Sequence, residues 1–257
     1  MDEIKNIKWM LPVLEHKEIA EETYRLTLDS SSIKGEILPG TFFNLTVPDR
    51  RFMLKRPISV FAVDLEKGHL SFIYKIMGQG TKSLTTVKVG EAICVLGPLG
   101  SGFPIQDESE VVLLIGGGVG VPPLYELACR LKAQGKQVIS VLGFRDRASV
   151  FCENEFKKLG RTIICTDNGS YGFSGLVTQA SEAEQIEFDT LYACGPRPML
   201  KAVDLKWRNK KKGYLSFEER MACGIGACYG CMTPTKDGLK RVCKDGPVFR
   251  LGEALYD

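Results

Sequence analysis

The chain has 257 residues, of which 44% are hydrophobic, and it carries a formal net charge of +3 at pH 7. This hydrophobic content suits packed cores and argues against extensive disorder, and so small a charge gives no reason to expect nucleic acid binding. The start, Met1 to Lys5, is charged, and even the longest uncharged stretches, such as Val111 to Tyr125, are shorter than the ~20 apolar residues of a spanning helix. We therefore expect a cytoplasmic protein without membrane insertion.

Residues 1–104 carry the pattern of a small antiparallel barrel. Hydrophobic residues alternate with polar ones in three runs, Tyr24 to Leu28, Phe43 to Val47 and Leu70 to Ile76. A period of two indicates strands with one buried face. Turn residues such as Leu38-Pro39-Gly40 separate the runs. Many short strands with even spacing predict a β-barrel.

The pattern changes near residue 105. Val111 to Ile115 is a continuous apolar run, which is typical of a strand buried on both faces of a parallel sheet. A helix is predicted to start at Pro122 and to end at Gly135. Further elements follow, namely strands at Val138–Leu142, Arg161–Thr166 and Leu191–Cys194 and a helix at Met199–Trp207. Strands that alternate with helices predict a parallel α/β domain.

Four of the nine cysteines crowd into the C-terminal region. Cys223, Cys228 and Cys231 follow the spacing C-x4-C-x2-C, and Cys243 comes later. The odd total and the length of the chain argue against a disulfide scaffold. This spacing is that of plant-type [2Fe–2S] ferredoxins, and the intervening glycines let backbone N–H groups point at the sulfurs. We therefore predict a [2Fe–2S] cluster on these four cysteines.

Two alternatives remain for the cysteines. Structural zinc sites usually combine two closely spaced pairs of ligands, whereas the second half here supplies only Cys243, and neither histidine of the chain is near. The other alternative is that the four cysteines are buried and unrelated. Metal analysis and a visible spectrum separate these interpretations, because zinc proteins are colourless.

Three shorter motifs indicate cofactor or nucleotide binding. Arg56-Pro57-Ile58-Ser59 begins a strand and pairs an arginine with a serine that can hold a phosphate or a ring oxygen. Gly116-Gly117-Gly118-Val119-Gly120 follows a buried strand and opens onto a helix, which suits a pyrophosphate. Cys194-Gly195-Pro196 ends a later strand, where ligands bind in such sheets. The first and third motifs are weak alone, and on its own Cys194 suits a core position better than a ligand site.

Together these motifs are recognisable. Their order along residues 1–210 resembles the ferredoxin–NADP reductase superfamily, and the segments Ser216–Cys231 and Val242–Phe249 narrow the resemblance to the electron-transfer subunits of dihydroorotate dehydrogenase B. The resemblance implies an α+β multidomain protein with three parts, namely an antiparallel β-barrel FAD domain at 1–104, an α/β parallel-sheet NAD domain at 105–212 and a small C-terminal [2Fe–2S] cluster domain at 213–257.

The resemblance also implies a function and its residues. The chain would pass electrons from an FMN-containing dihydroorotate dehydrogenase catalytic subunit through the cluster and FAD to NAD⁺ in pyrimidine biosynthesis, within a heterotetramer. It would bind FAD through Arg56, Pro57, Ile58, Ser59, Ile73, Tyr74, Lys75, Gly80 and Thr81. It would bind NAD through Gly116, Gly117, Gly118, Gly120, Cys194, Gly195 and Pro196, and the cluster through Cys223, Cys228, Cys231 and Cys243. No residue is expected to act as a catalytic acid or base.

Proteins with other functions combine the same domains and cofactors. The FAD and [2Fe–2S] subunits of bifurcating NADH-dependent ferredoxin–NADP oxidoreductases, sulfite reductases and hydrogenases are rivals, and a zinc-binding protein without redox activity is a further one. The choice of NAD over NADP rests on the resemblance alone. Arg145 and Arg147 follow the second strand of the α/β region and would suit a 2′-phosphate, whereas Asp146 between them would suit a free ribose hydroxyl.

Overall fold

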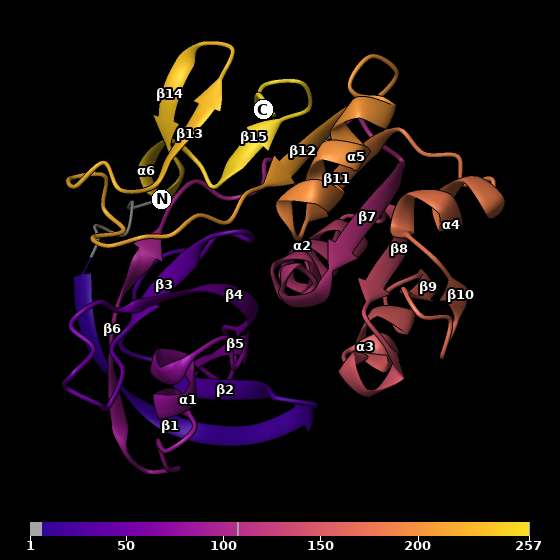
Figure 1. Cartoon of the computed structure of the whole chain (residues 1–257). Coiled ribbons are helices and arrows are strands. Elements are labelled where there is room, and N and C mark those ends of the chain that lie inside the picture. The colour runs from indigo at the N-terminus through magenta and orange to yellow at the C-terminus, as the bar shows by residue number, and fades with distance from the viewer. Residues whose placement is uncertain (1–6, 107, 257) are drawn as a thin grey trace.

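The computed structural model describes residues 7–106 and 108–256. Two β-structures lie side by side in Figure 1, with the C-terminal segment, drawn in yellow, above the barrel and beside β12. None of the described helices is both long and apolar enough to cross a membrane.

The N-terminal part is a closed antiparallel barrel with strand order β1-β2-β5-β4-β3-β6. The predicted alternation is confirmed. Leu26 and Leu28 on β2 are the antiparallel partners of Phe72 and Leu70 on the adjacent strand β5, and all four side chains are buried. The elements are β1 (Ile7–Ala20), β2 (Thr23–Asp29), β3 (Phe42–Leu45), β4 (Arg56–Asp64), β5 (His69–Lys75), α1 (Gln79–Leu84) and β6 (Ala92–Leu99).

A seven-stranded sheet follows, with order β10-β9-β8-β7-β11-β12-β15, in which only β15 runs antiparallel to its neighbour. Its strands are β7 (Val111–Gly117), β8 (Gln137–Phe144), β9 (Arg161–Thr166), β10 (Phe173–Ser174), β11 (Thr190–Cys194), β12 (Lys212–Ser216) and β15 (Val248–Arg250). Its helices are α2 (Pro122–Ala133), α3 (Glu153–Lys157), α4 (Val177–Ala183) and α5 (Arg197–Trp207), with short 3-10 turns at Gly118–Gly120 and Arg147–Ser149. The predicted parallel α/β arrangement is confirmed.

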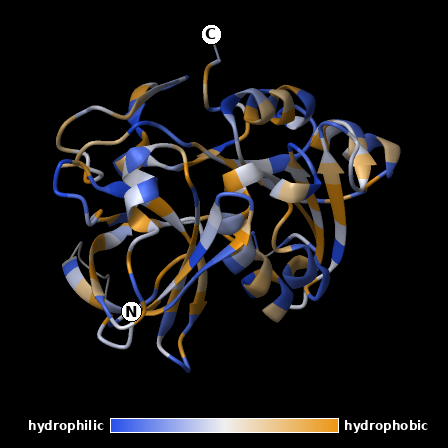
Figure 2. Ribbon diagram, turned by 60° about the horizontal axis from the view of Figure 1, so that its bottom comes forward, coloured by the Kyte–Doolittle hydropathy of each residue, from blue (hydrophilic) through white to orange (hydrophobic). Residues whose placement is uncertain are grey.

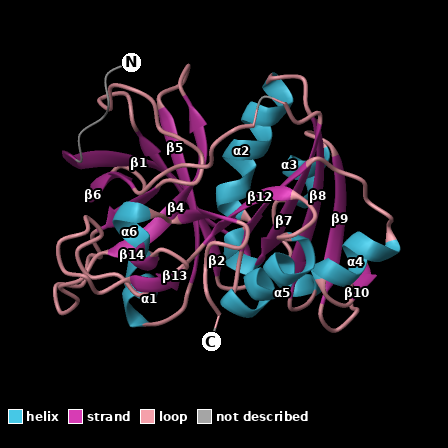
Figure 3. Cartoon of the chain, turned by 90° about the horizontal axis from the view of Figure 1, so that it is seen from above, coloured by secondary structure: helices cyan, strands magenta, loops and turns pink. Residues whose placement is uncertain are grey.

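Helices cover both faces of this sheet, as the view from above shows in Figure 3. Alternate residues of β7 point to opposite sides, so that Val112 and Leu114 pack with α2 and α3, whereas Leu113 and Ile115 pack with α4 and α5. Both faces are therefore buried, which explains the continuous apolar run in the sequence. The hydrophobic residues of these strands, orange in Figure 2, lie between the helical layers.

The C-terminal segment contains a hairpin of β13 (Met232–Thr235) and β14 (Gly238–Arg241), then α6 (Val242–Asp245). It is not separate from the α/β sheet. The boundary expected between residues 212 and 213 falls inside β12, and β15 returns from the C-terminal segment to pair with that strand. Strand pairing therefore fixes the cysteine-rich loops against the edge of the α/β sheet.

Candidate functional site

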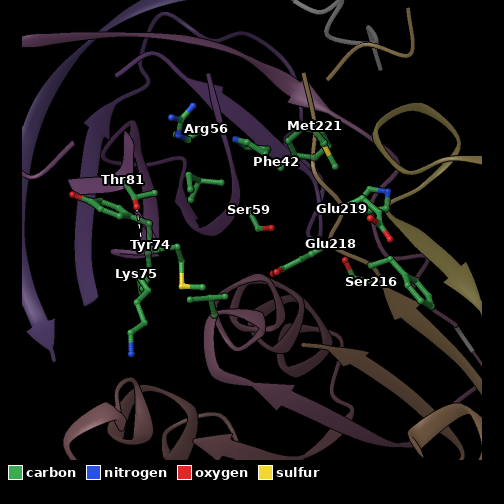
Figure 4. A pocket seen from close by; sticks show the side chains of 17 residues that line it. Phe42, Arg56, Ser59, Tyr74, Lys75, Thr81, Ser216, Glu218, Glu219 and Met221 are labelled. Carbon is green, nitrogen blue, oxygen red and sulfur yellow. Dashed lines mark hydrogen bonds between the residues drawn. The ribbon is translucent and has the colours of Figure 1, made fainter. Parts of the chain in front are cut away.

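A cavity of ≈ 350 Å³ opens between the barrel and the rest of the chain. Eight of the nine residues expected to bind FAD line it, and Figure 4 shows several of them converging on the same space. Antiparallel pairing of β4 with β5 explains this convergence, because the start of β4 meets the end of β5. The eight are Arg56, Pro57, Ile58, Ser59, Ile73, Tyr74, Lys75 and Thr81. Gly80, the ninth, lies against the guanidinium of Arg56.

Tyr74 is held in this cavity by a residue that the sequence did not single out. Its hydroxyl lies 2.9 Å from Nε2 of His16, and Nδ1 of His16 lies 2.8 Å from the carbonyl oxygen of Val87. A carbonyl can only accept, so Nδ1 donates to Val87 and Nε2 accepts from Tyr74. Burial raises the pKa of Tyr74, which keeps the phenol protonated as this donor.

The far wall of the cavity comes from other parts of the chain. Val119 from the glycine turn, Ser216 at the end of β12 and Met221 near the cysteine loop all line it. Glu218 also lines it, and its carboxylate projects into the same space as Ser59 in Figure 4. Its side chain is open to the cavity but surrounded by protein, and this burial raises its pKa. Only the structure shows that Glu218 lines the cavity. Its position five residues before Cys223 is the sequence feature that could have marked it as a candidate site residue.

Cys223, Cys228 and Cys231 lie in the segment before β13, and Cys243 lies in α6. Gly224 and Gly226 have φ angles of +71° and +81°, which glycine adopts readily, and these angles fold the segment before β13 tightly. Cys228 is exposed, Cys223 is partly buried, and Cys231 and Cys243 are buried.

Backbone N–H groups point at the sulfur atoms of all four cysteines. Ile225 and Cys228 donate to Cys223 over 3.5 and 3.4 Å, and Gly226 donates to Cys243 over 3.2 Å. Similar bonds of 3.4 Å run from Gly230 to Cys228 and from Cys243 to Cys231. N–H groups aimed at sulfur stabilise the thiolate that a metal needs.

The pKa of Cys223 shows this effect. Burial alone would raise it, but the N–H groups of the loop lower it to about 6. The pKa of Cys243 is instead raised to about 12 by burial and by the neighbouring thiol of Cys231. Among the described residues, no three metal-binding side chains lie close enough to hold one single ion. The donor set nevertheless fits a thiolate-bound iron–sulfur cluster, which spreads its ligands over more than one metal.

The cysteine loop adjoins the cavity of the barrel. Asn44 on β3 donates its side-chain N–H to the carbonyl oxygen of Cys223 over 3.1 Å, and the N–H of Ser101 donates to Gly246 over 2.6 Å. Met221, which lines the cavity, precedes Cys223 by two residues. A group bound in the cavity and a cluster on the loop would therefore be neighbours.

A second cavity, of ≈ 480 Å³, lies at the carboxyl ends of the parallel strands. Of the residues expected to bind NAD, Gly117, Gly118 and Pro196 line it. Gly116, Gly120 and Gly195 instead allow close packing of the β7 and β11 loops. A β-carbon on Gly120, for example, would lie 2.3 Å from the carbonyl oxygen of Cys194.

Cys194 lines neither cavity. Its side chain is 1% exposed within the core beneath the glycine turn, and burial raises the pKa of its thiol. A role for Cys194 in binding the nicotinamide stays a prediction.

Three family profiles match successive parts of the chain. An oxidoreductase FAD-binding domain matches residues 10–103, and an oxidoreductase NAD-binding domain matches residues 114–204. The iron-sulfur cluster binding domain of dihydroorotate dehydrogenase B matches residues 218–254. The three matches follow the order of the barrel, the α/β sheet and the cysteine loops.

Solved structures share this architecture. An NADH-dependent reduced ferredoxin-NADP oxidoreductase, studied for flavin-based electron bifurcation, superimposes with a TM-score of 0.88 and 31% identity, covering 97% of this chain and 91% of the other. The ferredoxin reductase of carbazole 1,9a-dioxygenase gives a TM-score of 0.70 at 21% identity, covering 82% and 68% of the two chains, which shows a common fold.

Curated relatives are more similar in sequence. The dihydroorotate dehydrogenase B (NAD(+)) electron transfer subunits of Shouchella clausii and Geobacillus thermodenitrificans are 44% and 46% identical to this chain. Each alignment covers 95% of this chain and 97% of the relative. With its FAD-binding, NAD-binding and iron–sulfur-binding domains, this chain belongs to the family of electron transfer subunits of NAD-dependent dihydroorotate dehydrogenase B.

Proposed function

We propose that this chain relays electrons from an FMN-containing catalytic subunit, which oxidises dihydroorotate, to NAD⁺. The observation that carries the proposal is the continuity of the three sites. Met221 joins the cavity of the barrel to the cysteine loop, and Val119 joins the same cavity to the glycine turn of the second cavity. A flavin exchanges single electrons as well as a hydride, so its place is between a one-electron cluster and a nicotinamide.

The residues of the first cavity would hold FAD. Arg56 and Lys75 bring positive charge to different ends of a cavity whose other walls are mostly apolar, and each charge would suit a phosphate oxygen. Ser59 offers a hydroxyl to the ring, and Tyr74 presents a ring that His16 keeps in one orientation. Gly117 and Gly118 would receive the pyrophosphate of NAD at the turn before α2.

The four cysteines would hold a [2Fe–2S] cluster. Cys228 and Tyr229 are exposed, so the cluster would lie near the surface at which electrons enter. The partner would be the FMN-containing catalytic subunit in a cytoplasmic heterotetramer. The two cavities discussed above are assigned to FAD and NAD, and dihydroorotate would be oxidised in the partner.

Reconstitution tests this proposal. The isolated chain should oxidise NADH with ferricyanide but should not convert dihydroorotate. Mixing it with an FMN-containing dihydroorotate dehydrogenase subunit should produce orotate and NADH together. Cys231→Ser should abolish this linked activity and keep much of the NADH–ferricyanide activity, because the flavin reduces a small oxidant directly. Orotate formation by the isolated chain would contradict the relay.

A second candidate has one observation in its favour. The structural similarity to the NADH-dependent ferredoxin–NADP oxidoreductase extends over almost the whole chain. In that case the chain would exchange electrons with a second flavin subunit that uses NADPH. Purification of the native complex decides between the two, because the partner would contain FMN in the first case and would reduce NADP⁺ in the second.

A further inference from the structure

The two cavities are carried by one strand of the barrel and one helix of the α/β sheet. The flavin motif Arg56–Ser59 opens β4, and the glycine turn Gly118–Gly120 leads into α2, with only Val121 between them. A hydride passes between a nicotinamide and a flavin only when the reacting atoms are closely aligned. Contacts between β4 and α2 therefore bear directly on the reaction, because they hold one cavity against the other.

One of these contacts is apolar. The ring of Tyr125 on α2 stacks on the ring of Phe61 on β4, with 4.6 Å between the centroids and 15° between the planes. The guanidinium of Arg25 also lies over the Phe61 ring, 4.9 Å from its centroid. Apolar burial is not directional. The stack thus brings α2 to β4 without fixing how far the helix lies along the strand.

A polar contact supplies the missing direction. The first half of β4, Arg56–Ser59, pairs with β3, whereas the second half, Val60–Asp64, pairs with β5. In that second half the backbone N–H of Val63 donates to Oε2 of Glu126 on α2 over 2.9 Å. Hydrogen bonds depend steeply on distance and angle, and a backbone N–H moves only with its strand. The bond therefore fixes β4 at one place along α2.

Glu126 is itself held in one orientation. Its side chain is 8% exposed, and its Oε1 accepts from Nε of Arg130, one turn along the helix, over 3.0 Å. Nη2 of Arg130 donates to the carbonyl oxygen of Ile37 over 2.6 Å, and its Nη1 pairs with Glu36. Both partners lie in the barrel, between β2 and β3. The helix is thus attached to the barrel at two points one turn apart, and the carboxylate of Glu126 takes part in both.

A second ion pair between the barrel and the α/β sheet offers a comparison. Nη2 of Arg25 on β2 donates to Glu155 on α3 over 2.6 Å, and the two side chains are 20% and 32% exposed. The helix α3 is not continuous with the glycine turn. This pair therefore holds the two parts of the chain together but has no direct connection to the turn between the cavities.

From this arrangement we propose that Glu126 is a positioning residue for hydride transfer. Its carboxylate holds β4 at a fixed place along α2, and it thereby sets the distance between the flavin and the nicotinamide. Glu126 lines neither cavity, so it acts through the strand and the helix and not by touching either cofactor. This inference rests on the proposed binding of FAD and NAD in the two cavities.

The rate of flavin reduction tests the inference. Flavin-loaded protein would be mixed rapidly with NADH without oxygen, and Glu126→Ala should slow the reduction at least about tenfold, because small displacements of reacting atoms have large effects on rate. The flavin content and the Kd for ADP-ribose, measured by calorimetry, should stay close to the wild-type values, because each cavity keeps its own residues. The long-wavelength charge-transfer absorbance of reduced flavin with NAD⁺ should weaken in parallel, because it requires contact between the two rings.

Two further variants at this position keep the test valid if Glu126→Ala does not fold. Glu126→Gln keeps an oxygen that accepts from Val63 and should therefore retain most of the wild-type rate. Glu126→Asp keeps the charge but retracts the carboxylate by one methylene, and it should slow the reduction. Glu155→Ala is the matched control, because it removes the other ion pair between the barrel and the sheet. It should lower the melting temperature and leave the rate of flavin reduction unchanged.

The outcomes separate positioning from simple stabilisation. A wild-type rate in Glu126→Ala or in Glu126→Asp, or equal slowing in Glu155→Ala, would overturn the role of Glu126. Loss of flavin or of ADP-ribose binding together with the rate would also overturn it, because the residue would then maintain a cavity and not the distance between two. Failure of the wild type to reduce its flavin with NADH would instead contradict the proposed function itself.

Discussion

Gly80 lies so close to Arg56 that a β-carbon at position 80 would stand 1.9 Å from Nη2 of the guanidinium. The guanidinium lines the flavin cavity and also lies over the ring of Phe52. Gly80 is inside α1, where alanine would favour the helix by about 1 kcal/mol. Glycine at position 80 therefore leaves space for the guanidinium of Arg56, although it does not favour the helix.

Gly80→Ala should displace Arg56 and weaken FAD binding. We expect the Kd for FAD to rise about tenfold, the loss expected when a charged hydrogen-bond donor leaves its ligand. Arg56→Ala should have an effect of similar size, and the double variant should be little worse than either single one. Fluorescence titration of flavin-free protein with FAD measures all three, and the iron content should stay constant.

Gly78→Ala is the control for this prediction. A β-carbon at position 78 meets nothing within 4 Å, and the φ angle of 166° is extended backbone that alanine adopts. Its affinity for FAD should equal that of the wild type. Wild-type affinity in Gly80→Ala would show that Arg56 does not hold the flavin.

The cluster prediction concerns Cys228, the exposed member of the four. Anaerobically purified protein should contain about two irons and two labile sulfides per chain. Cys228→Ser should lose most of the iron and keep most of the flavin, because the FAD-binding residues come chiefly from the barrel. Iron, sulfide and flavin analysis of one sample decides this.

Cys94→Ser provides the comparison, since Cys94 lies on β6 outside the cysteine loops. It should retain both cofactors. A wild-type content of one zinc without iron, or of four irons per chain, would contradict a [2Fe–2S] cluster.

Features that are local in the sequence could be predicted from it. Alternation over a few residues identified the barrel strands, and the continuous run at Val111–Ile115 identified a strand buried on both faces. The R-P-x-S motif and the cysteine spacing lie within short segments whose backbone brings their members together. In such motifs the spacing of the residues along the chain largely determines how close their side chains lie in space.

Features that depend on packing could not be predicted. His16 reaches Tyr74 from another strand, and Glu218 lines the flavin cavity only because β12 joins the α/β sheet. The domain boundary was expected at residue 212 because the sequence there becomes rich in Gly and Cys, and β15, which pairs with β12, has three residues, too few to show a period. Asp146 and Asp167 are both carboxylates near strand ends, and only the structure shows that Asp167 lines the second cavity whereas Asp146 does not.

Asp204 on α5 allows a prediction about pH. Its side chain is fully buried, Oδ1 accepts from the N–H of Gly252, and Oδ2 has no hydrogen-bond partner among the described residues. Burial raises its pKa above the usual 3.8, although Gly252 and Arg208 act in the opposite direction. Between the unfolded and the folded pKa the folded state keeps a proton that the unfolded state has lost, so the stability from this group is complete below the unfolded pKa and is lost as the pH rises through the folded one.

Asp204→Asn keeps the acceptor for Gly252 and removes this dependence. Its melting temperature should exceed that of the wild type near pH 8, and the difference should shrink toward about pH 4, close to the unfolded pKa of an aspartate. Asp237→Asn, at an exposed carboxylate of the hairpin, should show no such trend. A variant less stable than the wild type at every pH would mean that Arg208 compensates the buried charge.

Arg197 ties the α/β sheet to the cysteine-rich segment. It begins α5 directly after Cys194-Gly195-Pro196, and its Nη1 donates to Glu219 over 2.7 Å and to the hydroxyl of Thr233 over 3.4 Å. Its Nη2 donates to the carbonyl oxygen of Leu255 over 3.3 Å. One side chain therefore connects the nucleotide-binding turn, the wall of the flavin cavity and the hairpin beside the cluster.

Arg197→Ala should loosen these three attachments without unfolding the chain. The side chains of Arg197 and Glu219 are 39% and 28% exposed, so the loss of stability should be about 1 kcal/mol. Hydrogen exchange should accelerate at residues 217–221 and 232–235, while the barrel strands keep their protection. Lys201→Ala is the control, because Lys201 lies on the same helix and makes no hydrogen bond or ion pair with the described residues. Equal acceleration in both variants would mean that α5 as a whole, and not the guanidinium of Arg197, holds the cysteine-rich segment in place.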